Sequence, residues 1–143
     1  MKTVDTLKTE FDSRSVNESF ARITAAAFIA RLDPTLEEIN DVKTAVSEAV
    51  TNCIVHAYPS ALGKIHMTVR LRENGSAVII VKDHGCGIAD IALAKTPMYT
   101  TGGNERSGMG FSVMESFMDK VSVRSSPGHG TTVTMTKKFS AKE

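Results

Sequence analysis

Three polar side chains recur at every fourth position within residues 46–57, namely Glu48, Asn52 and His56. On a helix this spacing places them along one side. A carboxylate, a carboxamide and an imidazole can exchange protons or bind ligands, but burying them is costly unless they find partners. Most of the intervening residues are apolar, so the helix is expected to pack into a core. The alternative, an exposed polar stripe on an ordinary amphipathic helix, stays open on this segment alone.

Two glycine motifs follow. Asp83-His84-Gly85-Cys86-Gly87 follows an apolar strand-like run at residues 77–81, with only Lys82 between them. Its glycines let a backbone approach a flat ligand closely, and its aspartate supplies an acceptor at the end of a strand. Ser107-Gly108-Met109-Gly110 leads into a helix, whose first N–H groups favour an anion. Taken singly, a strand-exit turn and an ordinary helix start explain these motifs, and Gly130-Thr131 is a weaker signal still.

The periodicity predicts the elements that would position these residues. Alternating and continuous apolar runs predict strands, and runs with a period near 3.6 predict helices. The expected order is an edge strand at 7–11, helices at about 16–31 and 36–57, a hairpin from 64–72 and 77–81, a helix at 109–118, and a hairpin from 121–125 and 131–139. We therefore predict an α+β two-layer sandwich, with a mixed, mostly antiparallel sheet covered on one face by helices.

The ends of the first two helices also carry signals. Asp12 and Ser13 are candidate N-caps for the first helix. Its apolar side is expected to comprise Phe20, Ile23, Ala27, Phe28 and Leu32. Thr35 and Glu38 form a capping-box pattern that opens the second helix, and Tyr58-Pro59 is expected to end it.

Bulk properties limit the class of protein. The chain has 143 residues, 41% hydrophobic and 23% charged, which is typical of one globular domain spanning 1–143. A formal net charge of +1 argues against direct nucleic-acid binding, and no apolar run is long enough to cross a membrane. No signal peptide is expected at the N-terminus. The two cysteines lack zinc-type spacing, so a reducing cytoplasm is the expected location.

Together and in this order, four motifs resemble those of the Bergerat-type ATPases and kinases, a superfamily that includes gyrase B, Hsp90, MutL and the histidine kinases. They are Glu48-x-x-x-Asn52, Asp83-x-Gly85-x-Gly87, Gly108-x-Gly110 and Gly130-Thr131. Residues 20–22, 48–52 and 105–119 are similar to one branch, the small serine kinases that act as anti-sigma factors, and within it to the sporulation anti-sigma-F family. This resemblance covers about residues 11–138.

The resemblance implies ATP and Mg²⁺ as cofactors. Asn52 would be the magnesium ligand, since an amide oxygen suits a hard cation. Glu48 would be the general base that takes the hydroxyl proton of a substrate serine. Asp83 would accept from the adenine amino group with support from Thr131, and the glycine pair Gly85 and Gly87 would make room beside the nucleotide.

Further roles follow from the same resemblance. Phosphates would be cradled at the helix start by Ser107, Gly108, Met109 and Gly110. Arg106 would meet the γ-phosphate, although a solvated charge is an equal alternative. Thr100 and Thr101 would belong to a lid over the ATP at residues 94–105. In the resembled family the first helix docks proteins, so Arg14 and Arg22 are candidate partner contacts, with ordinary surface charges as the alternative.

The function implied is that of an anti-sigma factor. As a homodimer holding ATP it would sequester a sporulation sigma factor, and it would phosphorylate an anti-anti-sigma protein on serine. A stress-response anti-sigma kinase has the same chemistry and another partner. An ATP-switched binding module without phosphotransfer and a detached histidine-kinase catalytic domain are rivals. The acid at Glu48 argues against the first, and the lack of an added phospho-accepting helical hairpin argues against the second.

Overall fold

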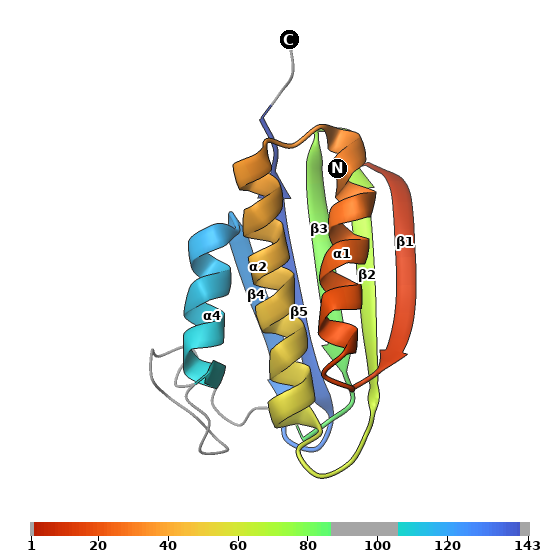
Figure 1. Cartoon of the computed structure of the whole chain (residues 1–143), viewed down its shortest axis with the longest axis vertical. Helices are drawn as coiled ribbons and strands as arrows, with labels where there is room; N and C mark the ends of the chain where they lie inside the picture. Colours follow the sequence, from red (N-terminus) through yellow and green to blue (C-terminus); the bar gives the residue numbers. More distant parts are fainter. Residues whose placement is uncertain (1, 87–105, 141–143) are drawn as a thin grey trace.

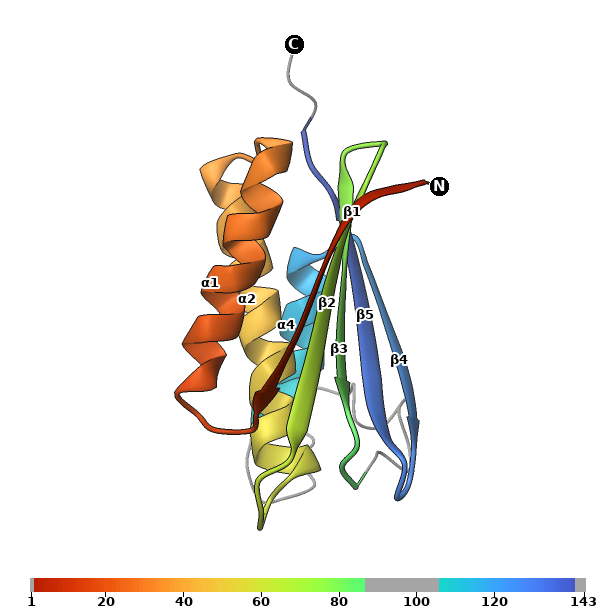
Figure 2. The same cartoon turned by 90° about the vertical axis from the view of Figure 1, so that its right-hand side faces the viewer.

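A five-stranded antiparallel sheet forms one layer of the molecule, and helices α1, α2 and α4 cover one of its faces (Figure 1). The computed structural model describes residues 2–86 and 106–140, and of residues 106–110 only the backbone. Figure 2 shows the two layers edge-on, with these helices all on the same side of the sheet. The predicted α+β two-layer sandwich is confirmed.

The strands run in the spatial order β1-β2-β3-β5-β4. Their bounds are β1 (Thr3–Asp12), β2 (Lys64–Arg72), β3 (Ser76–Asp83), β4 (Lys120–Ser126) and β5 (Gly130–Lys138). All four pairings among them are antiparallel. The first strand lies at an edge, as its half-apolar sequence predicted. In β2 every second side chain is buried, which places Ile65, Met67, Val69 and Leu71 under the helices.

The helices are α1 (Asn17–Ile29), α2 (Leu36–Asn52) and α4 (Arg106–Phe117). A short 3₁₀ turn, η1 (Ala30–Leu32), follows α1, and a π-helical turn, η2 (Cys53–Ala57), prolongs α2. The predicted capping box is present: Glu38 N–H donates to Thr35 Oγ1 at 3.1 Å, and Thr35 N–H donates to Glu38 Oε1 at 2.8 Å. The predicted second helix is therefore correct in extent, but its last turn is widened.

The prediction for the apolar side of α1 was wrong in part. Phe20 and Ile23 are 49% and 57% exposed, and Ala27 is exposed as well. The helix instead buries its small residues, Ala21, Ala25 and Ala26, together with Ile29. Small side chains let a helix backbone approach its neighbours closely, so this side packs inward although its residues are less apolar. Phe20 and Ile23 are left on the surface, whereas Phe28 and Leu32 are half-buried and pack against the core as predicted.

The predicted caps of α1 were also wrong. Asp12 is the last residue of β1, and the residue before the helix, Val16, makes no side-chain cap. The hydroxyl of Ser13 accepts instead from the Gly63 N–H at 2.9 Å, and the Ser13 N–H donates to the Gly63 carbonyl at 2.9 Å. Both groups therefore fasten the entry of α1 to the start of β2, a long-range contact that the local sequence does not indicate.

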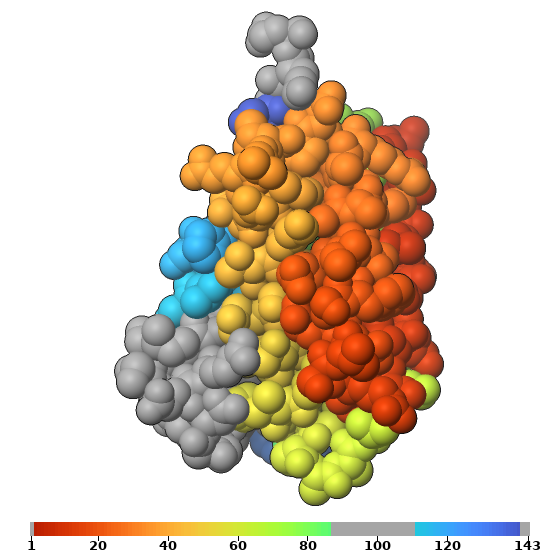
Figure 3. All heavy atoms as spheres, viewed as in Figure 1, coloured from red at the N-terminus to blue at the C-terminus, as the bar shows by residue number. Residues whose placement is uncertain are grey.

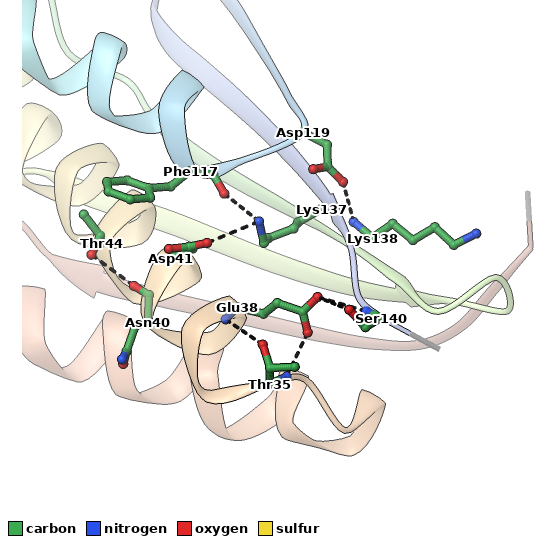
Figure 4. Close-up of polar contacts among 10 residues, drawn as sticks. All are labelled: Thr35, Glu38, Asn40, Asp41, Thr44, Phe117, Asp119, Lys137, Lys138 and Ser140. Atoms are coloured by element: carbon green, nitrogen blue, oxygen red, sulfur yellow. Dashed lines mark hydrogen bonds and ion pairs between the residues drawn. The ribbon is translucent and has the colours of Figure 1, made fainter. Parts of the chain in front are cut away.

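The end of β5 ties the helical layer to the sheet (Figure 4). Lys137 Nζ donates to the Phe117 carbonyl at 2.8 Å and lies 3.5 Å from Asp41 Oδ2. Ser140 donates through its N–H and its hydroxyl to Glu38 Oε2, both at 2.9 Å. Lys137 thus joins the C-terminal end of α4 to the first half of α2.

Replacing Lys137 by methionine is expected to lower the free energy of unfolding by about 1–3 kcal/mol. Its side chain is only 12% exposed, so the change leaves the Asp41 carboxylate and the Phe117 carbonyl without this donor in a half-buried place. Urea denaturation followed by circular dichroism measures the loss. Lys138→Met is the control, because Lys138 is exposed and its backbone N–H, not its side chain, binds Asp119. Equal stability of both variants would contradict this role of Lys137.

Candidate functional site

The residues of the candidate site meet at the end of the sheet where β3 stops. Asp83, the last residue of β3, is 4% exposed and lies opposite Thr131 in the register of β3 with β5. Its Oδ1 accepts from the Gly85 N–H at 2.9 Å and from the Thr131 N–H at 3.2 Å. Its Oδ2 accepts from the Cys53 thiol at 3.4 Å. The Asp83 carboxylate therefore links the motif that begins at Asp83 to the Gly130-Thr131 motif, although Asp83 and Thr131 are 48 residues apart.

Two glycines allow backbone segments to approach each other around Asp83. A Cβ at Gly85 would lie 2.6 Å from Ala57 Cβ and would overlap the Ala57 carbonyl. A Cβ at Gly130 would overlap the Asp83 carbonyl oxygen, and the φ of Gly130 is +90°, in the left-handed region. The structure therefore explains glycine at both positions by close protein packing, whereas the sequence had indicated space for a ligand at Gly85.

The loop after β3 is fastened to the end of α2. The Cys86 N–H donates to the Ala57 carbonyl at 3.2 Å, and the Cys86 thiol donates to the His56 carbonyl at 3.0 Å. Tyr58 Oη accepts from the His84 N–H at 2.7 Å and donates to the Lys64 carbonyl at 2.8 Å. These bonds hold the Asp83 loop against the π-helical turn η2. Such turns are frequent at functional sites, since they redirect the side chains of a helix.

Burial sets the protonation of the groups around Asp83. It raises the pKa of the Cys53 thiol well above its usual value, and the nearby Asp83 charge and hydrogen bond raise it further. Burial also raises the pKa of Tyr58 and lowers the pKa of His56. The thiol and the phenol therefore keep their protons at neutral pH, and the neutral form of His56 is favoured.

Asn52 ends α2 one turn after Glu48. Its Oδ1 and Nδ2 are both buried and have no hydrogen-bond partner among the residues that the structure describes. Buried amide groups are normally satisfied, so this side chain fits a ligand. Within residues 2–86 and 106–140 no three histidine, cysteine, aspartate or glutamate side chains gather as a metal site. A Mg²⁺ ion held through Asn52 would therefore take most other ligands from phosphates and water.

Glu48 faces a pocket of about 350 Å³ between α1 and α2. The pocket is lined by Arg22, Asn40, Lys43, Thr44, Ser47 and Glu48. Arg22 belongs to α1, where its Nε lies 3.0 Å from Glu18 Oε2. Figure 3 views the face on which α1 and α2 lie side by side. The Glu48 carboxylate shares this pocket with the cationic side chains of Arg22 and Lys43, so a polar group of another molecule that enters the pocket can contact it.

The other predicted residues are not all placed beside these. Arg14 is exposed in the turn before α1. Arg106, Ser107, Gly108, Met109 and Gly110 form the first residues of α4, and only their helical backbone is described. The predicted phosphate motif thus lies in the first turns of a helix, which begins three residues earlier than the predicted start at residue 109. Gly87, Thr100, Thr101 and the lid at 94–105 lie outside the described residues.

Two residues of this site escaped the analysis of the sequence. Cys53 follows Asn52 directly and was assigned no role from the sequence, yet its thiol binds Asp83. Ser125 Oγ lies 2.8 Å from Thr131 Oγ1 and donates to the Gly130 carbonyl at 3.0 Å. Ser125 lies on β4 directly opposite Thr131 on β5, and only the pairing of these two strands shows that the residues are neighbours.

Comparisons with known proteins find matches along most of the chain. Residues 10–137 match the family described as "Histidine kinase-like ATPase domain". A protein named "Anti-sigma F factor" from Pasteuria penetrans is 53% identical over 137 residues, which cover 94% of this chain and 91% of that protein. Another of the same name, from Bacillus subtilis (strain 168), is 51% identical over 133 residues, covering 92% of this chain and 90% of that protein.

A solved structure shares the fold. The crystal structure of the RsbU and RsbW domains of Rv1364c from Mycobacterium tuberculosis matches with a TM-score of 0.72 at 21% identity. The match covers 96% of this chain and 33% of that one. No described helix is long and apolar enough to span a bilayer.

Proposed function

The chain belongs to the anti-sigma F factor family and carries a histidine kinase-like ATPase domain, and on that premise we propose that it is an ATP-dependent protein serine kinase that inhibits a sporulation sigma factor. Its protein substrate is the anti-anti-sigma antagonist of that sigma factor. Residues 1–143 act as one domain. One observation carries this proposal: Glu48 and Asn52 lie one turn apart on α2. Glu48 lines a surface pocket, and the buried amide of Asn52 makes no hydrogen bond with the described residues.

The nucleotide is held at the Asp83 end of the sheet. Asp83 accepts from the adenine amino group, and Thr131, fixed opposite it in β5, supports the same edge of the ring. The N-terminus of α4, with Ser107, Gly108, Met109 and Gly110, favours the phosphates, because its first N–H groups are unpaired by the helix itself. Arg106 adds a positive charge at this point. Gly87, Thr100 and Thr101 complete the nucleotide contacts.

Glu48 supplies the base. It takes the proton of the substrate serine hydroxyl as the serine oxygen bonds to the γ-phosphorus, while the bond from that phosphorus to the bridging oxygen breaks and ADP leaves. Asn52 would hold Mg²⁺ through its amide oxygen, and the ion, when bound, would supply positive charge that stabilises the phosphates. The pocket beside Glu48 orients the serine-bearing segment, and Arg22 and Lys43 on its wall favour acidic residues in that segment.

The surface of α1 is the proposed docking site for protein partners. Val16, Phe20 and Ile23 are 70%, 49% and 57% exposed and follow one another at helical spacing. Exposed apolar residues of this size mark an interaction surface when they are contiguous. Arg14 and Arg22 flank them, so the surface offers apolar area together with positive charge. It serves the sigma factor, the antagonist and the second subunit of a homodimer.

Reversing the charge of Arg22 is expected to weaken capture of the sigma factor by at least about tenfold, since charged pairs in interfaces contribute strongly when they are desolvated. Surface plasmon resonance with Arg22→Glu and the sigma factor measures this loss in the presence of ATP. Lys82→Glu is the control, because Lys82 is exposed on β3 and points to the uncovered face of the sheet. Unchanged affinity of the Arg22 variant would remove this residue from the docking surface.

Transfer of labelled γ-phosphate from Mg-ATP to the anti-anti-sigma protein tests the proposed function. Label on a serine of that protein, together with ATP-dependent capture of the sigma factor, supports it. If ATP binds and the sigma factor is captured but no phosphate moves, the chain is an ATP-switched binding module. Preference for a stress-response sigma factor over the sporulation one would change the partner and leave the chemistry intact.

A further inference from the structure

The carboxylate of Asp83 is held unequally at its two oxygens. Oδ1 receives two backbone donors, from Gly85 at 2.9 Å and Thr131 at 3.2 Å. Among the described residues, Oδ2 receives only the thiol of Cys53, at 3.4 Å. A carboxylate oxygen accepts about two hydrogen bonds, so Oδ1 is filled and Oδ2 keeps one position for a ligand. Cys53 therefore binds the same oxygen that remains available.

The three donors come from separate parts of the fold. Gly85 belongs to the loop after β3, Thr131 to β5, and Cys53 to the π-helical turn at the end of α2. The two donors on Oδ1 hold that oxygen to the loop after β3 and to β5. The thiol on Oδ2 adds a third point of attachment, from the end of α2, so all three parts of the fold together set the orientation of the carboxylate. Cys53 is itself 4% exposed, so its own position is fixed by packing.

We propose that Cys53 is a positioning residue for base recognition, whose thiol directs Oδ2 of Asp83 toward the amino group of adenine. This rests on the proposed function, in which Asp83 reads that amino group. A fixed acceptor favours adenine, which presents an amino donor at this edge, over guanine, which presents a carbonyl oxygen there. An S–H group is a weak donor, so it orients the oxygen while leaving most of its negative charge for the ligand.

The test measures whether Cys53 and the adenine amino group depend on each other. Affinities for ATP and for purine riboside triphosphate, which lacks the amino group, are measured by calorimetry for the wild-type protein, Cys53→Ala and Cys53→Val. In the wild type, loss of the amino group is expected to weaken binding strongly. In both variants we expect ATP to bind about three- to tenfold more weakly and the analogue to bind as before.

Cys53→Ser separates orientation from packing. Serine restores a donor at the position, so this variant is expected to recover most of the preference for ATP over the analogue. If Cys53 only fills space, the alanine and valine variants would change both affinities by the same factor, and the inference would be overturned. The valine variant keeps the test valid where alanine lowers stability, since its volume is close to that of cysteine.

The outcomes also separate this inference from the proposed function. A wild-type protein that does not bind ATP overturns both. A wild-type protein that binds ATP, with the same dependence on the amino group in all Cys53 variants, overturns the role of Cys53 and leaves the kinase intact. A smaller dependence in Cys53→Ala and Cys53→Val, restored in Cys53→Ser, supports the role of the thiol.

Discussion

Glu48→Gln is expected to slow phosphoryl transfer to the anti-anti-sigma protein by about 10²- to 10⁴-fold, with the affinity for ATP unchanged. Glutamine has nearly the same shape as glutamate, but its amide does not accept the proton of the serine hydroxyl. Glu48 is only partly buried and lies on the wall of the pocket between α1 and α2, so the exchange leaves the core untouched. The loss should appear in the rate of transfer within a bound complex.

Single-turnover transfer of labelled phosphate measures that rate, and calorimetry measures ATP binding in parallel. Glu37→Gln is the matched control, because Glu37 carries the same charge, is exposed and lies in the first turn of the same helix. It is expected to behave as the wild type. A Glu48→Gln variant that transfers phosphate at the normal rate would show that another group, or none, serves as base. A variant that no longer binds ATP would give Glu48 a structural role instead.

Gly130→Ala is expected to lower the free energy of unfolding by about 3 kcal/mol and to weaken ATP binding together with it. The φ of Gly130 is +90°, which costs an L-residue about 1–2 kcal/mol. The new Cβ would also overlap the Asp83 carbonyl oxygen and lie 2.8 Å from His84 Cα, and such overpacking costs about 1–3 kcal/mol. Both neighbours are backbone, so relief of the clash has to shift the strand end that carries the Asp83 carboxylate.

Gly128→Ala provides a close control in the same turn. Gly128 also has a positive φ, of +78°, but nothing lies within 4 Å of a Cβ built there. This variant should lose only about 1 kcal/mol and should bind ATP normally. Chemical denaturation and calorimetry on both variants separate backbone strain from crowding. Equal losses in the two variants would show that strain alone accounts for the effect at Gly130.

Local patterns in the sequence predicted much of the fold. The strict alternation from residue 64 to residue 72 predicted β2, because a strand with one buried face must alternate. The capping box at Thr35 and Glu38 marked the start of α2, since both partners lie within one turn. The edge position of β1 followed from its half-apolar face. These features depend on neighbours within a few residues, and the sequence contains all of that information.

Helix α1 shows where local patterns fail. Two of its large apolar residues, Phe20 and Ile23, were expected inside and lie outside. Periodicity identifies an apolar stripe, but it does not tell whether the sheet and α2 accept large side chains or need small ones. The close packing of Ala21, Ala25 and Ala26 decided which side faces inward. Phe20 and Ile23 remain on the surface, which is the place proposed here for partner binding.

The sequence by itself determined the family, the α+β class and the identity of the motif residues, because these depend on residue types in a fixed order along the chain. Only the tertiary structure decided which of those residues touch. It joined Asp83 to Thr131 through the register of β3 with β5, and it brought Cys53 to Asp83 from a turn 30 residues away. Such contacts arise from the packing of a helix end on a sheet edge, and hydrogen bonds across that junction leave no periodic signal in the sequence.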